Sequence, residues 1–207
     1  MNPRIKQLTA AFHQNKIDAF LVTKDINMTY LTGFPACESW LLVGLHRAYY
    51  VTDFRYVHEA RKGLKGINVK RYTHSMVETL VEVIKSMRVK RIGIDARHLT
   101  LFQYRMLERW CPKGIRLVTV NNLVEDLRAV KDKNEVKKVK KALGIHKQAH
   151  QFIKRNIKPN MTERELFLRL ERFVKSKEAG FAFDPIIASG SNSCYPHAKI
   201  TERKILL

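Results

Sequence analysis

Cysteine is scarce in this 207-residue chain, and the few cysteines are poorly spaced for cross-links. The three are Cys37, Cys111 and Cys194, an odd number spread over most of the length. This spacing fits neither a disulfide framework nor the paired Cys-x-x-Cys ligands of a structural zinc site. We therefore expect reduced thiols. Cys194 precedes His197 closely enough to leave a thiol–imidazole pair or half of a metal site open, although neighbours in a turn rarely face each other.

Long apolar runs are also missing. Although 45% of the residues are hydrophobic, no stretch approaches the ~20 consecutive apolar residues of a membrane-spanning helix. The N-terminal sequence MNPRIKQLTAAF has no apolar segment of a secretory signal. We therefore expect a cytoplasmic protein without membrane contacts. Neither G-x-G-x-x-G nor the Walker glycine loop occurs, which disfavours binding of nucleotide phosphates.

Acidic side chains are outnumbered. Lys and Arg total 39 against 19 Asp and Glu, and the formal net charge is +20 at pH 7. Such a surplus favours contact with polyanions such as nucleic acid, or with an acidic partner, but it says nothing about the fold. The plainer interpretation is a lysine-rich proteome.

Apolar, β-branched runs alternate with segments of helical spacing through the first 130 residues. This alternation predicts a layered α/β domain around a largely buried sheet. Gly33 and Asp53 are expected to end one helix and to N-cap another. The expected strands are 18–22, 47–52, 67–72, 90–95 and 115–120, and the expected helices are 3–15, 27–33, 53–60, 76–87, 99–110 and 122–130.

The composition changes near Lys131. Residues 131–158 carry ten Lys or Arg against two acids, and their apolar residues keep a helical spacing. At 207 residues the chain exceeds a typical single domain of ~100 to 150 residues, so a second, smaller or partial domain is expected. We assign residues 1–130 to one domain and residues 131–207 to an incomplete second domain.

Two residue spacings in this second domain bear on a metal site and on a helix cap. His146 and His150 lie one helical turn apart, but the segment HKQAH lacks the glutamate of a zinc-peptidase helix. We expect a solvated helix face there. Thr162 and Glu165 have the spacing of a capping box, which predicts the start of another helix.

Residue types that are common in functional sites are concentrated in residues 180–198, GFAFDPIIASGSNSCYPHA. The apolar first part predicts an extended segment against a core, and residues 189–193 predict a turn. Pro196 restricts the backbone immediately before His197, so the imidazole is presented from a constrained position. A lone histidine in a loop is more often structural or solvated than catalytic, so at this point both a structural role and a site role of His197 stay open.

The pattern F-D-x-I-I-A-S-G-x-N-S-x-x-P-H-A in this stretch resembles the segment that leads into the active site of the Xaa-Pro metallopeptidases, the creatinase, aminopeptidase P and prolidase family. Other stretches resemble the same family: N-M-T-Y-L-T-G-F at 27–34, V-T-D-F-R-Y-V-H-E-A at 51–60 and V-E-D-L-R-A-V-K-D-K-N-E-V at 124–136. The resemblance extends over essentially the whole chain.

The resemblance implies a creatinase-type N-terminal α/β domain with a mostly buried mixed sheet, followed by the first part of an α+β pita-bread catalytic domain. In the family, two aspartates, a histidine and two glutamates hold two divalent metal ions, Mn, Co or Zn, beyond the P-H-A motif. The chain is thus expected to be truncated before the metal ligands and to hold no metal or cofactor alone. His197 matches a histidine that orients the substrate near the scissile peptide.

Three functions remain open. The first is an Xaa-Pro dipeptidase or aminopeptidase by family, hydrolysing peptide bonds next to proline but inactive as this chain alone. The second is a non-catalytic module whose basic surface contacts nucleic acid or an acidic partner. The third is one half of a split enzyme. The expected partners are a proline-containing peptide, a second copy or a complementing C-terminal chain, with nucleic acid ranked last.

Overall fold

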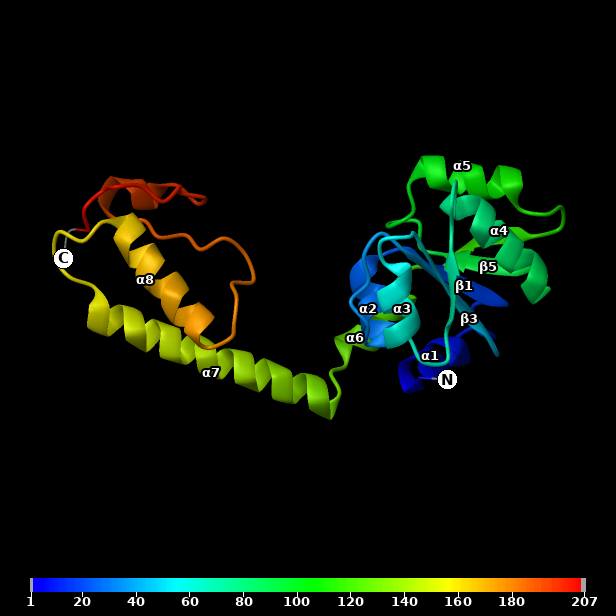
Figure 1. Ribbon diagram of the computed structural model, residues 1–207, viewed down its shortest axis with the longest axis horizontal. Coiled ribbons are helices and arrows are strands. Elements are labelled where there is room, and N and C mark those ends of the chain that lie inside the picture. Colours follow the sequence, from blue (N-terminus) through cyan, green and yellow to red (C-terminus); the bar gives the residue numbers. More distant parts are fainter. Residues whose placement is uncertain (1, 206–207) are drawn as a thin grey trace. The chain divides into compact units, whose positions relative to one another are not determined.

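The computed structural model describes residues 2–205. The chain divides into two compact units, residues 1–130 and 131–207 (Figure 1). Among the described residues, no helix combines the length and the apolar character that crossing a membrane requires.

Six strands form one mixed sheet at the centre of the first unit. They are β1 (Ala19–Val22), β2 (Trp40–Gly44), β3 (Ala48–Thr52), β4 (Asn68–Arg71), β5 (Arg91–Ile94) and β6 (Arg116–Thr119). The strand order is β4-β3-β2-β1-β5-β6, in which β2 is antiparallel to both of its neighbours and the other pairs are parallel.

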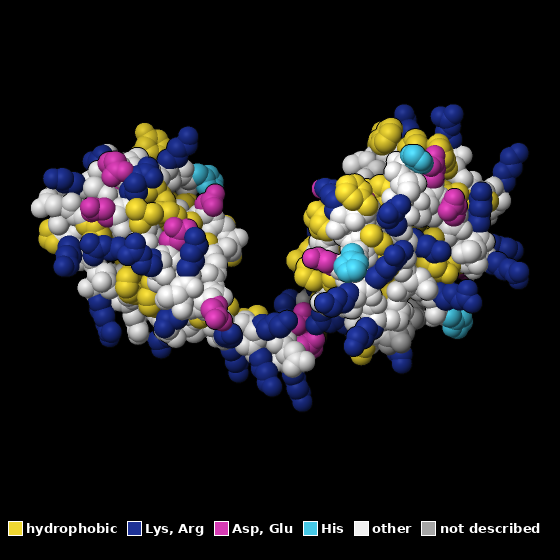
Figure 2. All heavy atoms as spheres, in the orientation of Figure 1, with side chains coloured by type: hydrophobic (Ala, Val, Ile, Leu, Met, Phe, Trp, Pro, Cys, Tyr) yellow, Lys and Arg dark blue, Asp and Glu magenta, His cyan; other side chains and the backbone are white. Residues whose placement is uncertain are grey.

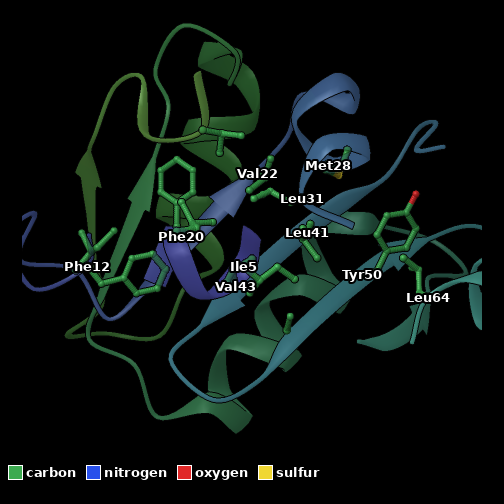
Figure 3. Packing of buried hydrophobic residues seen from close by; sticks show 14 of the residues in the cluster. Ile5, Phe12, Phe20, Val22, Met28, Leu31, Leu41, Val43, Tyr50 and Leu64 are labelled. Carbon is green, nitrogen blue, oxygen red and sulfur yellow. The ribbon is translucent and has the colours of Figure 1, made fainter. Parts of the chain in front are cut away.

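Helices cover both faces of this sheet. Alternate strand residues point to opposite sides, and apolar side chains on both sides need to be covered. Phe20 and Val22 of β1 pack in one apolar cluster, whereas Ala19 and Leu21 pack in the other. The first cluster, shown in Figure 3, includes residues of α1, α2 and α6, and the second includes residues of α4 and α5. The helices are α1 (Pro3–Ala10), α2 (Asp25–Thr32), α3 (Val57–Gly63), α4 (Met76–Met87), α5 (Leu101–Trp110) and α6 (Leu123–Ala129).

The predicted α/β class with a mostly buried mixed sheet is confirmed, and several element ends follow the expected local chemistry. Gly33 ends α2 in the left-handed conformation at φ 73°. The Ser75 side chain accepts a hydrogen bond from the Glu78 N–H and so caps α4. β2 was not among the expected strands.

The helix expected from Asp53 begins later, at Val57, and Asp53 is not its N-cap. The Asp53 carboxylate instead accepts hydrogen bonds from the backbone N–H and the Nε of Arg55, each at 2.8 Å. These bonds close a turn over residues 54–56 before the helix starts. The Arg55 guanidinium also lies 5.0 Å from the centre of the Tyr56 ring, so this motif braces the junction between β3 and α3.

The second unit contains two long helices and a 3₁₀ turn. Capping boxes start both long helices, one formed by Asp132 with Glu135 and the other, as predicted, by Thr162 with Glu165. Phe152 stacks on Phe173 with the ring centres 4.5 Å apart, which joins the two helices. The elements are α7 (Lys133–Asn156), α8 (Glu163–Ser176) and η1 (Gly190–Cys194).

α7 has no buried residue along its 24 positions. Its apolar stripe is open to solvent, with Val139 50% exposed and Leu143 59% exposed. Lys and Arg side chains project from the same helix (Figure 2). The helix is therefore held by its cap and by its contacts with α8, while its N-terminal half stays uncovered.

The extended segment expected after α8 does not form a strand. Residues 181–189 have no regular secondary structure, and Phe183 is 77% exposed. A strand needs a hydrogen-bonded neighbour, and the described part of the second unit offers one isolated bridge, between Thr162 and Lys204. Within this segment Ile187 packs, as expected, against the small core of Met161, Leu166 and Ile205, whereas Phe183 is open to solvent.

Candidate functional site

His197 lies in a turn that follows η1. The Ala198 N–H donates to the Tyr195 carbonyl at 3.2 Å, which closes the turn around Pro196 and His197. The imidazole is exposed, and among the described residues it has no hydrogen-bond partner. Its place is therefore set by the backbone that carries it rather than by contacts of the ring.

The loop that leads to this turn is closed by its own polar groups. The Ser193 hydroxyl donates to the Gly190 carbonyl at 2.6 Å, and the Asn192 N–H donates to the Ser189 carbonyl at 3.2 Å. The Asn192 amide also donates to the Lys199 carbonyl at 3.1 Å, which joins the two sides of the loop. Gly190 has φ +55°, a conformation that residues with a side chain rarely adopt.

Glu163, the first residue of α8, anchors the loop from inside. It is 0% exposed, and its carboxylate accepts hydrogen bonds from three residues far along the chain. The donors are the Ser189 N–H at 2.7 Å, the Asn192 amide at 3.1 and 2.9 Å, the Thr201 hydroxyl at 2.7 Å and the Thr201 N–H at 3.1 Å.

The charge on this carboxylate is maintained by those donors. Burial by itself would raise the pKa of Glu163, because it disfavours the charged form. The hydrogen bonds from Thr201, Asn192 and Ser189 outweigh burial and hold the pKa below its ordinary value. Glu163 is thus an ionised, buried acceptor whose partners all belong to the loop that contains His197.

The backbone after the loop also binds the start of α8. The Glu163 N–H donates to the Arg203 carbonyl at 3.0 Å and the Arg164 N–H to the Thr201 carbonyl at 3.1 Å. These bonds use N–H groups that the first turn of a helix leaves without partners inside the helix. Ile205 is buried in a small cluster with Met161 and Leu166. The loop is therefore tied to α8 through both its side chains and its main chain.

Other residues singled out in the sequence take minor roles. Cys37, Cys111 and Cys194 are free thiols, as expected, and no hydrogen bond between Cys194 and His197 is found in the described chain. Glu202, a residue of the segment after the loop, contacts Arg164, and one of its carboxylate oxygens accepts a hydrogen bond from the Thr162 hydroxyl at 3.3 Å. Glu163 itself was missed, because a glutamate beside an N-cap threonine usually faces water.

His146 and His150 line an apolar groove of about 450 Å³ in the second unit. Residues of α7, α8 and the segment 179–185 form its walls, including Phe181 and Phe183. Both histidines are exposed, and neither belongs to a group of three ligating side chains within the described residues. The exposure of both histidines agrees with the expected solvated helix face.

One group of ligand-type side chains does converge, in the first unit. The ligand atoms of Asp95, His98 and Glu125 all lie within 4.8 Å of one another. Cations of the chain already occupy their ligand atoms: the Lys24 Nζ lies 3.2 Å from the His98 Nε2 and 3.7 Å from a Glu125 oxygen, and Arg97 pairs with Asp95 at 2.8 Å. These residues do not fit a metal ion, because lysine and arginine occupy the space and the charge that a metal would use.

Comparison with known protein families identifies the class of protein to which this fold and the anchored loop belong. Residues 4–130 match the model of the creatinase/prolidase N-terminal domain, and residues 137–206 match the model of metallopeptidase family M24. The chain belongs to the creatinase/prolidase N-terminal domain family.

The relatives extend the likeness to both units. An uncharacterized peptidase of Bacillus subtilis is 30% identical over 98% of this chain, and an Xaa-Pro dipeptidase of Pyrococcus horikoshii is 28% identical over 99%. Among solved structures, an Xaa-Pro dipeptidase from Bacillus anthracis covers 98% of this chain at 29% identity with a TM-score of 0.85. The predicted family and fold class are therefore confirmed.

The chain is shorter than these relatives. It spans 57% of the length of both curated relatives and 57% of the Bacillus anthracis structure.

Proposed function

We propose that this chain supplies the N-terminal domain and the substrate-contacting loop of a metal-dependent peptidase that cleaves peptide bonds next to proline. The observation that carries the proposal is the match of both units, over 98% of the chain, to an Xaa-Pro dipeptidase structure. The M24 match over residues 137–206 includes the anchored loop and His197. Residues 1–130 and 131–207 would then be the N-terminal domain and the first part of the catalytic domain.

In this proposal His197 orients the substrate. Its imidazole is exposed, and its backbone is held by the turn at Pro196 and by the anchored loop, so the ring is available to a ligand without a competing partner among the described residues. A neutral imidazole offers one donor and one acceptor to the peptide group. Activation of water is assigned to the part of the relatives that this chain does not span, because the described residues offer no fitting metal site.

A completed enzyme tests the proposal. The chain would be joined to the remaining part of the Bacillus anthracis dipeptidase, and hydrolysis of Ala-Pro would be measured with Mn²⁺ present. We expect turnover that a chelator abolishes. His197→Ala should lower kcat/KM by roughly tenfold or more, the size expected when a positioned hydrogen bond to the reacting group is lost.

His150→Ala is the matched control, since His150 is another exposed histidine of the second unit. It should leave kcat/KM within about twofold of the parent, as expected for a surface change away from the reacting groups. Equal turnover of the parent and the His197→Ala enzyme, both folded by circular dichroism, would refute the role of His197. A folded completed enzyme without proline-dependent cleavage would refute the function itself.

The basic surface supports a second candidate, a module that binds polyanions. Residues 131–158 carry ten Lys or Arg, and α7 buries none of its residues. Neutralising phosphates releases counterions, so binding to a nonspecific duplex should weaken steeply with added salt. Absence of binding at ~50 mM salt, where such contacts are strong, would remove this candidate.

A further inference from the structure

The hydrogen bonds of Glu163 divide between the two sides of the loop. Ser189 and Asn192 precede His197, and Thr201 follows it. One carboxylate therefore holds both sides of the segment that presents the imidazole. A further bond across the loop, from the Asn192 amide to the Lys199 carbonyl, starts from a side chain that Glu163 also binds.

A capping role for the helix alone does not explain this arrangement. Acidic residues stabilise a helix N-terminus from an exposed position, and Glu165 already does so, because its carboxylate accepts from the Thr162 N–H at 3.0 Å. Glu163 is instead turned inward and buried, with its hydrogen bonds to loop residues 26 to 38 positions away. Its contacts serve the loop rather than the helix.

We propose that Glu163 is a positioning residue, whose carboxylate clamps residues 189–201 and thereby sets where His197 meets the substrate peptide. The second half of this statement rests on the proposed function, and the first half does not. Glu163→Gln removes the charge and replaces one of the two acceptor oxygens by an NH2 donor, so the donors of Ser189, Asn192 and Thr201 share one remaining acceptor, and the loop should open more readily while α8 remains capped by Thr162 and Glu165.

Trypsin reports on the loop in the full 207-residue chain, because Lys199 lies inside the clamped segment. Glu163→Gln should accelerate cleavage after Lys199, followed by mass spectrometry, by roughly ten- to hundredfold, as expected when charged hydrogen bonds that close a segment are lost. Glu165→Gln, an identical change two residues along the same helix turn, should alter that rate by less than about twofold.

Thr201→Val provides a milder variant that removes one hydroxyl donor and keeps the fold. It should accelerate the same cleavage less than Glu163→Gln does. The acceleration in the double variant should be smaller than the product of the two single accelerations, because both changes weaken the same hydrogen bond, between the Thr201 hydroxyl and the Glu163 carboxylate. Equal acceleration by Glu163→Gln and Glu165→Gln, or fully multiplicative effects of Glu163→Gln and Thr201→Val, would overturn the clamp.

The completed enzyme separates positioning from mere stability. If Glu163 acts through His197, Glu163→Gln should lower kcat/KM by roughly tenfold in the parent but by less than about twofold in a His197→Ala background. The same loss in both backgrounds would show a general structural role and overturn the positioning claim. If the completed enzyme cleaves nothing, the proposed function fails, whereas the trypsin result still decides the clamp.

Discussion

Limited proteolysis should leave the first unit intact and degrade the second. Of the buried hydrophobic side chains in the described chain, 32 belong to the first unit and six to the second. One residue in about four is thus a buried hydrophobic in the first unit, against about one in thirteen in the second. Because burial of such side chains is the main stabilising contribution, the second unit should open far more readily.

The size of the difference follows from the cost of opening. Cleavage inside a folded domain requires unfolding that typically costs ~5 to 15 kcal/mol. The N-terminal half of α7 has no buried side chain, so its local opening should cost at most about 2 kcal/mol. A difference of at least about 3 kcal/mol corresponds to a rate ratio above roughly 100-fold, since 1.4 kcal/mol is a factor of ten.

The assay is a time course with dilute trypsin, read by intact mass. The first unit contains 21 of the 39 Lys and Arg, so site number alone would favour cutting there. We expect early cuts after Lys131 to Lys141 and a resistant fragment that ends near residue 130. Equal survival of both units, in a chain that sedimentation shows to be monomeric, would refute the reasoning. A dimer or a bound partner that covers the second unit would account for its protection.

Tyr50→Phe should raise the melting temperature of the first unit by about 3 °C in calorimetry, because the buried phenol oxygen lies near the Ser39 side chain and the Cys37 backbone but makes no hydrogen bond of ordinary geometry with a described residue, and such a hydroxyl costs roughly 1 kcal/mol. Asp18→Asn should flatten the decline in unfolding free energy below pH ~4. The side-chain hydrogen bond from Arg91 lowers the pKa of Asp18 in the folded protein. The stabilisation is therefore present above the pKa of Asp18 in the unfolded chain and is lost as the pH falls through its pKa in the folded protein. In urea titrations from pH 3 to 7, equal declines of the unfolding free energy in the parent and in Asp18→Asn would contradict this. The chain alone, given Mn²⁺, Co²⁺ or Zn²⁺, should release no proline from Ala-Pro, since its converging ligand-type side chains in the described part are paired with Lys and Arg. Chelator-sensitive release would contradict that expectation.

Much of the first unit could be predicted because its signals are local. α4 matches its expected range of 76–87, since Ser75 caps a run with strong helical spacing. β2 was missed although Trp40–Gly44 is an apolar run buried along its whole length, the same signal that did predict β1. Asp53 failed as a cap because Arg55, two residues later, binds its carboxylate.

The candidate site could be predicted only in part. The P-H-A pattern led to His197, whose role stays a prediction. Glu163 could not be found in the same way, because its partners lie 26 to 38 residues further along the chain. The segment before the loop, expected to be extended, forms no strand, because strand pairing depends on neighbours and the described second unit has one isolated bridge, between Thr162 and Lys204.

The uncovered N-terminal half of α7 makes it nearly an isolated peptide helix. Helices of ~12 to 15 residues are marginal in water without tertiary contacts, since nucleation is costly and each added residue contributes little. Lys137 and Lys141, four residues apart, repel each other, and Gly144 interrupts propagation. This half should therefore melt gradually, gaining helix on cooling and with added salt, well below the cooperative transition of the first unit.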